Sequence, residues 1–217
     1  MSAAMGCCSM PAPGSSWLGA ATSFMGMWVL MMVPMMLPAL IPALARYQRA
    51  GGGWGASPLT ALVGAGYFFV WGAVGVFLYP LAVAVTAVEA REPALAGALP
   101  LAAGLVVLLA GVVQISAWKA RGVAGCREAP EFGAIPAGAR AALRHGMRLG
   151  IRCVRCCGNL MAVLLAVGMM DLRWMLVVTA AITIERVMPS GVRLARAIGV
   201  AVVLWGVALI ARAAGLS

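Results

Sequence analysis

The chain has 217 residues, of which 64% are hydrophobic and 10% are charged, and its mean hydropathy is +1.00. These values exclude a soluble globular domain, because water does not solvate so apolar a surface. The formal charge of +10 would suggest nucleic-acid binding in a soluble protein. Here the basic residues lie between apolar runs, so we expect anionic lipid headgroups as the counter-charge and no nucleic acid as a partner.

The apolar runs predict an all-α fold, a polytopic transmembrane bundle of about six helices. Residues 1–16 form a short outer tail without Lys or Arg, and the run that follows is too long and too rich in proline for a cleaved signal peptide. A helix needs about 20 apolar residues to cross the bilayer. We therefore expect one transmembrane domain over residues 17–217, with helices near 17–45, 57–88, 94–118, 149–170, 172–188 and 194–212.

The first predicted helix is dense in methionine, with six between residues 25 and 36. Met27, Met31 and Met35 follow one another at intervals of four and share a helical face. Thioethers are soft ligands that suit Cu(I), so Met31 and Met35 are candidate metal ligands; ordinary apolar packing is the alternative. Prolines at positions 34, 38 and 42 remove helix hydrogen bonds and predict a kinked or loosened inner half.

The only sizeable loop expected outside the membrane covers residues 119–148, and it is basic. Arginines continue from this loop into the fourth helix at helical spacing, which predicts an amphipathic basic helix along the cytoplasmic headgroups. The stripe consists of Arg140, Arg144, Arg148, Arg152 and Arg155.

The charges of the loops predict the orientation of the bundle. Loops after the first, third and fifth predicted helices hold 13 of the 16 Lys and Arg residues. Because basic loops stay in the cytoplasm, we expect a multi-pass protein with both termini outside.

Cysteines near the start of the fourth predicted helix form the sharpest candidate site. Cys153, Cys156 and Cys157 follow a Cys-x-x-Cys-Cys pattern, with Met161 four residues later, so their sulfur atoms can gather along one helix edge. Soft sulfur ligands suit Cu(I) or Zn(II), and Cys126 from the preceding loop is a candidate to complete the set. The alternative interpretation is that these are small buried residues that only pack.

Two carboxylates and the single histidine complete the candidates. Asp171 follows two methionines at the outer face, where it is either a helix N-cap or a metal ligand. Glu185 is expected to pair with a basic residue such as Arg152, Arg155 or Arg186, because unpaired charge in a membrane is costly. With one histidine, His145, the sequence offers little for histidine-based metal sites or a Ser-His-Asp triad.

Several spaced motifs resemble a family of bacterial integral membrane proteins of unknown function that is described as predicted metal-binding. The motifs are Gln114 with Lys119, Cys126-Arg127 with Pro130, Cys153-Val154-Arg155-Cys156-Cys157 with Leu160-Met161, Gly168-Met169-Met170-Asp171-Leu172-Arg173-Trp174, Glu185 with Pro189 and Gly191, Met27-Trp28 with Met31, Met35-Met36-Leu37-Pro38, and Tyr67 with Trp71. The chain differs from the family in having Gly158 after the double cysteine in place of an aromatic residue, and Asp171 in place of an asparagine. The resemblance implies metal binding in the bacterial cytoplasmic membrane.

We therefore expect a membrane protein that binds or hands over a soft metal ion, copper with zinc as the alternative, and not an enzyme. The expected surroundings are the lipid bilayer and a larger membrane complex or a metal-dependent membrane enzyme. The competing hypothesis is an accessory or structural subunit of a membrane complex that carries no metal of its own.

Overall fold

The computed structural model describes residues 17–50, 58–127, 138–168, 171–188 and 190–215, without the side chains of residues 50, 93–96 and 123–127. Within these ranges the chain is entirely helical and contains no strand, which confirms the predicted fold class. The helices are α2 (Trp17–Ala50), α3 (Pro58–Arg91), α4 (Pro93–Ile115), α5 (Ala117–Arg127), α6 (Ala139–Val167), α7 (Leu172–Val187) and α8 (Gly191–Ala213).

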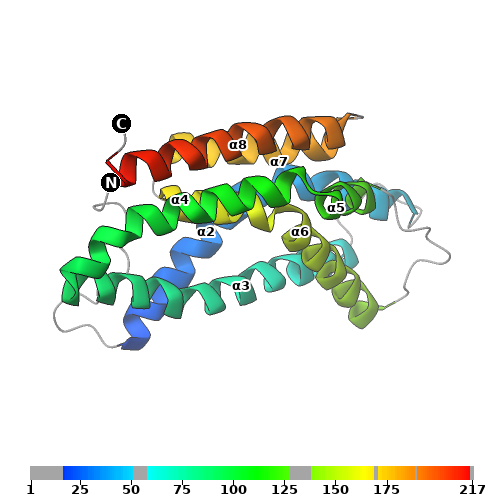
Figure 1. Cartoon of the computed structure of the whole chain (residues 1–217). Coiled ribbons are helices and arrows are strands. Elements are labelled where there is room, and N and C mark those ends of the chain that lie inside the picture. Colours follow the sequence, from blue (N-terminus) through cyan, green and yellow to red (C-terminus); the bar gives the residue numbers. More distant parts are fainter. Residues whose placement is uncertain (1–16, 51–57, 128–137, 169–170, 189, 216–217) are drawn as a thin grey trace.

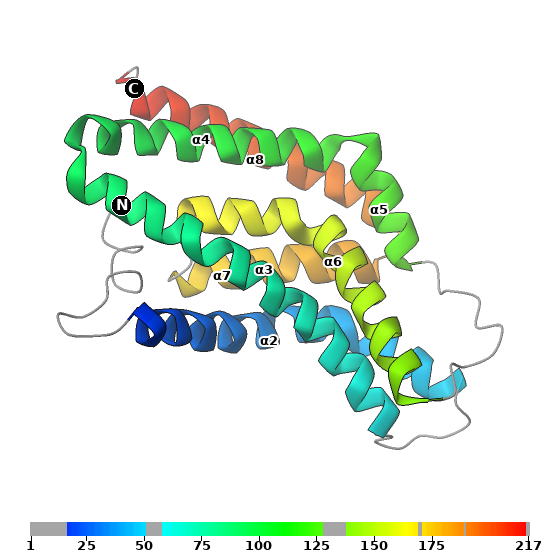
Figure 2. The same ribbon diagram turned by 90° about the horizontal axis from the view of Figure 1, so that it is seen from below.

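The long helices lie side by side in one bundle (Figures 1 and 2). α4 packs along α8, and α3 packs along α6. Figure 2 shows α6 and α7 between the α4–α8 pair and α2. This order places α6 at the centre, in contact with helices on both sides.

Glycines allow α3 and α6 to approach until their backbones touch. A Cβ atom on Gly146 would lie 2.0 Å from the carbonyl oxygen of Val63, and one on Gly66 would lie 2.4 Å from that of Leu143. No side chain fits at such distances, so glycine is required on both helices. The contact fixes α3 and α6 as one closely packed unit.

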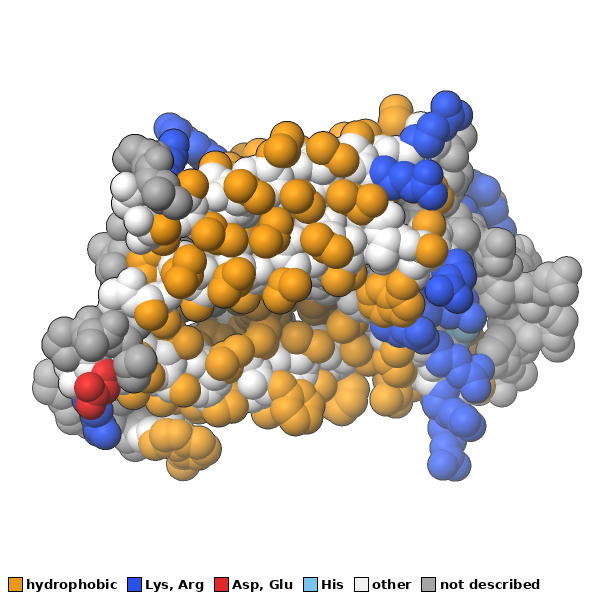
Figure 3. Space-filling view, in the orientation of Figure 1, with side chains coloured by type: hydrophobic (Ala, Val, Ile, Leu, Met, Phe, Trp, Pro, Cys, Tyr) orange, Lys and Arg blue, Asp and Glu red, His pale blue; other side chains and the backbone are white. Residues whose placement is uncertain are grey.

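The outer surface is an apolar band with charged side chains gathered at its two ends (Figure 3). Large apolar side chains are widely exposed, including Phe77 at 80% and Leu30 at 76%. Five helices, α2, α3, α4, α6 and α8, are long and apolar enough to cross a membrane. A lipid environment explains both the exposed apolar band and the polar ends.

The observed helices differ from the predicted ones in three places. α7 has 16 residues, fewer than the roughly 20 that span a bilayer, so a sixth crossing stays a prediction. Most of α5 lies in the predicted loop, and the predicted basic helix is continuous with the fourth predicted span, so that both form α6. α2 continues to Ala50, beyond the predicted end at residue 45, and contains all three prolines, while the predicted kink stays a prediction.

The main core lies where α2, α3, α6 and α7 meet. It contains Trp28, Tyr67 and Trp71, none more than 2% exposed. The indole nitrogen of Trp28 donates a hydrogen bond of 2.9 Å to the backbone oxygen of Trp71, which joins α2 to α3. Sulfur-bearing side chains from α2 and α6 fill the middle of this core.

Candidate metal centre

The three clustered thiols lie on the buried face of α6. Cys153, Cys156 and Cys157 are each no more than 2% exposed. Buried positions recur along this helix every three or four residues, as expected where one face meets its neighbours. The arginines of the predicted stripe are all exposed on the remaining faces. Burial alone fits both a metal site and simple packing, so the sulfur contacts must distinguish them.

Cys153 is the centre of a row of sulfur atoms. Its Sγ lies 3.9 Å from Cys157 Sγ and 3.9 Å from Met36 Sδ. With metal–sulfur bonds of about 2.3 Å, two sulfurs bound to one ion at roughly 120° lie about 4.0 Å apart. Both distances therefore suit sulfur ligands that share a single ion.

The methionines of α2 and the thiols of α6 belong to the same core cluster. Met31, Met35 and Met161 are all buried in it, so the predicted thioethers and thiols share one core. The thioether beside Cys153 is nevertheless that of Met36, which our site prediction did not include. Met36 has the same helical spacing as the chosen residues, but periodicity alone does not reveal which face of α2 meets α6.

A tyrosine from α3 completes the surroundings of Cys153. The hydroxyl of Tyr67 donates a hydrogen bond of 2.9 Å to Cys153 Sγ. Tyr67 is 1% exposed, and the backbone contact between α3 and α6 holds it against the thiol. The sequence pointed to Tyr67 only through a family motif, because a hydrogen bond between residues 86 positions apart leaves no local pattern.

The thiols alone do not form a cage for a metal. Cys153 and Cys157 are in contact, Sγ to Sγ, at 3.9 Å, and Cys156 is buried close to them on the same helix. Over the described ranges, no three His, Cys, Asp or Glu side chains are grouped so that they could hold a metal ion. The Met36 thioether, 3.9 Å from Cys153 Sγ, is a further soft ligand in contact with these thiols.

A buried polar network lies on the other side of α6. Lys119 Nζ lies 3.0 Å from Glu185 Oε2 and donates to the backbone oxygen of Cys156 at 2.6 Å and to Asn159 Oδ1 at 3.5 Å. Gln114 donates to Glu185 and accepts from Asn159. Both charged side chains are at most 2% exposed, so the opposite charges compensate each other inside the bundle.

The predicted pairing of Glu185 with a basic residue is confirmed, but its partner is Lys119 and not one of the three arginines named as examples. α5 follows α4 after a single residue and turns Lys119 inward, although we had placed it at the start of an exposed loop. Arg152 and Arg155 are exposed on α6, and Arg186 donates instead to the backbone oxygen of Ala39 at 3.4 Å.

Of the remaining predicted ligands, the structure describes the side chain of Asp171 alone, and it lies outside the buried sulfur cluster. Asp171 is exposed and caps α7, its carboxylate accepting a hydrogen bond of 2.9 Å from the backbone N–H of Arg173. The adjacent Met169 and Met170 lie outside the described residues, as does the side chain of Cys126 in α5. His145 stacks on Tyr47 with ring centroids 5.6 Å apart, away from the thiols.

A family model matches most of the chain. The model of a family described as "PpoB2: Copper chaperone" matches residues 25–209, which include all or part of every described helix. No curated protein and no solved structure matches the chain. The matched region contains both the sulfur row and the buried polar network.

Proposed function

The chain belongs to the PpoB2 family of copper chaperones, and from that premise we propose that it holds one Cu(I) ion between Cys153, Cys157 and Met36. The observation that carries the proposal is the pair of 3.9 Å separations that centre on Cys153 Sγ. Two thiolates and a thioether are a soft ligand set of the kind that selects Cu(I).

Binding of Cu(I) at this row is a simple ligand substitution. The two thiol protons are released to bulk solvent as two sulfur–copper bonds form, and Met36 adds a neutral third ligand. The product carries one net negative charge, which the Tyr67 hydroxyl stabilises through its hydrogen bond to Cys153 Sγ. Copper stays Cu(I) throughout, so the step needs no electron donor or acceptor.

The ligand set favours copper over zinc. Structural zinc sites use four tetrahedral ligands, usually thiolates and histidines. This centre offers two thiols that share a 3.9 Å separation and a thioether, while His145 lies elsewhere against Tyr47. We therefore assign Cu(I) as the ion and treat zinc as the result that elemental analysis must exclude.

Anaerobic copper titration of the purified protein in detergent tests the proposal. With a competing Cu(I) chelator, the wild-type chain should bind one equivalent, and Cys153→Ser and Cys157→Ser should each abolish that binding. Met36→Leu should weaken binding by about tenfold, which corresponds to roughly 1.4 kcal/mol for one lost ligand.

Met147→Leu is the matched control for Met36→Leu. Met147 is a half-buried thioether of α6 that does not belong to the core cluster, so its replacement should leave the affinity unchanged. Thermal unfolding of each metal-free variant separates lost ligands from lost structure. One bound copper in the folded Cys153→Ser, Cys157→Ser double variant would refute the proposed site.

A metal-free accessory subunit is the competing function, and the copper chaperone family does not favour it. We propose instead that the chain hands its ion to a copper-dependent enzyme of the same membrane. Co-purification in mild detergent discriminates the two functions. A stable complex with no copper in either the complex or the isolated chain would support the accessory subunit.

We also propose that the arginine-rich end of the bundle faces the cytoplasm and that both termini face outward. Basic side chains crowd one end of the apolar band (Figure 3), as the positive-inside rule requires. Reporter fusions in the segment at residues 128–137 should register as cytoplasmic, and fusions after residue 215 should register as external. The opposite pattern would reverse the orientation without changing the copper site.

A further inference from the structure

Sulfur atoms are distributed unevenly about the thiol pair formed by Cys153 and Cys157. The arginine-rich end is the end of the bundle where α2 finishes and α6 begins. All core thioethers of α2 lie between Met36 and the opposite end, and on α6 Met161 lies on that same side of the thiols. Met175, near the start of α7, also packs there against the cluster. Among the described residues, the thioethers nearer the arginine-rich end, Met147 and Met188, do not belong to this cluster.

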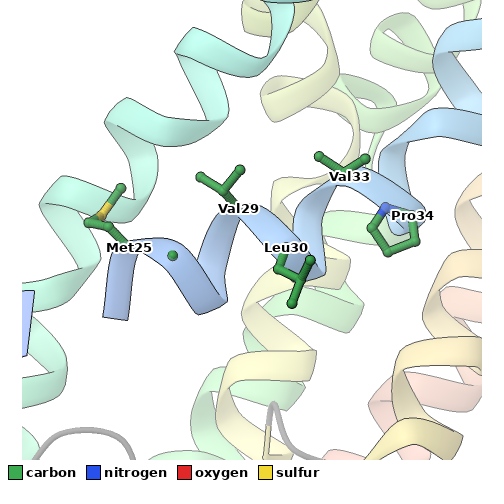
Figure 4. A pocket seen from close by; sticks show the side chains of 6 residues that line it. Met25, Val29, Leu30, Val33 and Pro34 are labelled. Atoms are coloured by element: carbon green, nitrogen blue, oxygen red, sulfur yellow. The ribbon is translucent and has the colours of Figure 1, made fainter. Parts of the chain in front are cut away.

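On one face of α2, a series of thioethers extends from the sulfur row to the surface. Met25, Met32 and Met36 are spaced by seven and four residues, which places them on one helical face over about 16 Å. Met32 and Met36 are buried, whereas Met25 is half-buried and lines an open apolar groove of 750 Å³. Met25, Val29 and Val33 point to the same side of α2 within that groove (Figure 4).

The arginine-rich side of the site is closed and positively charged. On that side α6 touches α3 backbone to backbone: a Cβ on Gly150 would lie 3.0 Å from the Tyr67 oxygen, and one on Gly146 would lie 2.0 Å from the Val63 oxygen. The guanidinium of Arg186 is held at the Ala39 oxygen, one turn beyond Met36. A cation that leaves in this direction meets close-packed backbone and a like charge.

We propose that copper reaches and leaves the thiol pair only from the end opposite the arginines, along Met32 and Met25. This rests on the proposed function and adds the direction of exchange and the residues that line it. During release, the bonds from Cu(I) to the two thiolates break as bonds to thioethers form, and the thiolates regain protons from water. The acceptor is a protein with soft ligands that docks at that end, near the groove at Met25.

Sided membrane vesicles test this direction. Right-side-out and inside-out vesicles containing the copper-loaded chain are exposed, without oxygen, to bathocuproine disulfonate, a membrane-impermeant Cu(I) chelator. An epitope inserted at residues 128–137 reports, by its protease accessibility, which vesicles have the arginine-rich end outside. Copper should be removed at least about tenfold faster when the opposite end is outside, equivalent to a barrier difference of roughly 1.4 kcal/mol.

Met25→Leu and Met32→Leu should slow this removal while equilibrium affinity stays within about twofold, since neither residue is among the three proposed ligands. Met147→Leu, at the other end, should change neither quantity. Equal rates from both sides, or faster removal from the arginine-rich side, would overturn the direction while leaving the copper site intact. Absence of bound copper in both vesicle types would overturn the site and the direction together.

Discussion

The two sides of α6 hold different kinds of chemistry. Toward α2 and α3 the helix presents Cys153 and Cys157, which contact a thioether and a phenol. On its other side, the Cys156 carbonyl and the Asn159 amide join the Lys119–Glu185 ion pair. The first set is uncharged and has soft ligands to offer, whereas the second already has its charges balanced. The sulfur side can therefore accept a cation, as proposed above. The polar side instead holds α4, α5, α6 and α7 together.

Removing one charge of the buried Lys119–Glu185 ion pair should have the largest effect on stability. Glu185→Ala leaves the Lys119 ammonium buried without its counter-charge, which should destabilise the bundle by roughly 3–5 kcal/mol. Thermal unfolding in detergent measures the loss. Replacing both members, Lys119→Met with Glu185→Leu, should recover most of it, because no buried charge then remains. Full stability of Glu185→Ala alone would contradict the proposed division between the two sides.

An intermediate effect is expected where the sulfur side depends on close helix contact. Gly146→Ala forces a methyl group onto the Val63 carbonyl and should cost about 1–3 kcal/mol of stability. Gly158→Ala, on the same helix, meets nothing within 4 Å and should be neutral or stabilising by up to ~1 kcal/mol. Thermal unfolding of both variants makes the comparison. Equal loss in the two would mean that the α3–α6 contact is looser than described.

The smallest effect should come from the Tyr67 hydroxyl. Tyr67→Phe keeps the ring packing but removes the hydrogen bond to Cys153 Sγ, so copper affinity should fall by about 0.5–1.5 kcal/mol, or roughly two- to tenfold in Kd. Competition with a Cu(I) chelator measures the change, and thermal unfolding of the metal-free variant should stay close to wild type. Unchanged affinity would show that the hydroxyl only packs against the thiol.

Features that depend on composition and local spacing were predictable from the sequence. The apolar runs predicted the all-helical fold, and the Cys-x-x-Cys-Cys spacing predicted that the thiols lie on one face of a helix. The continuity of α6 was not predicted, because the arginine stripe and the apolar half that follows it have opposite solvent preferences. A helix tolerates both when the arginines stay on the exposed face.

Contacts between distant helices were not predictable in the same way. Met36 was missed in favour of Met31 and Met35, since methionines at a spacing of four lie on two neighbouring faces of α2 and only the packing of α2 on α6 shows which face meets the thiols. Glu185 was assigned to nearby arginines because the long reach from α5 to α7 leaves no trace in local sequence. In both cases the missed partner comes from another helix: Met36 of α2 contacts Cys153 of α6, and Lys119 of α5 pairs with Glu185 of α7.

The single rod formed by α6 links the membrane surface to the sulfur row. Its first half carries Arg140, Arg144 and Arg148 on the exposed side, and the same unbroken helix continues to Cys153 and Cys157. Because one hydrogen-bonded helix carries both groups, the depth at which the arginines meet the lipid headgroups also sets the depth of the thiols in the membrane.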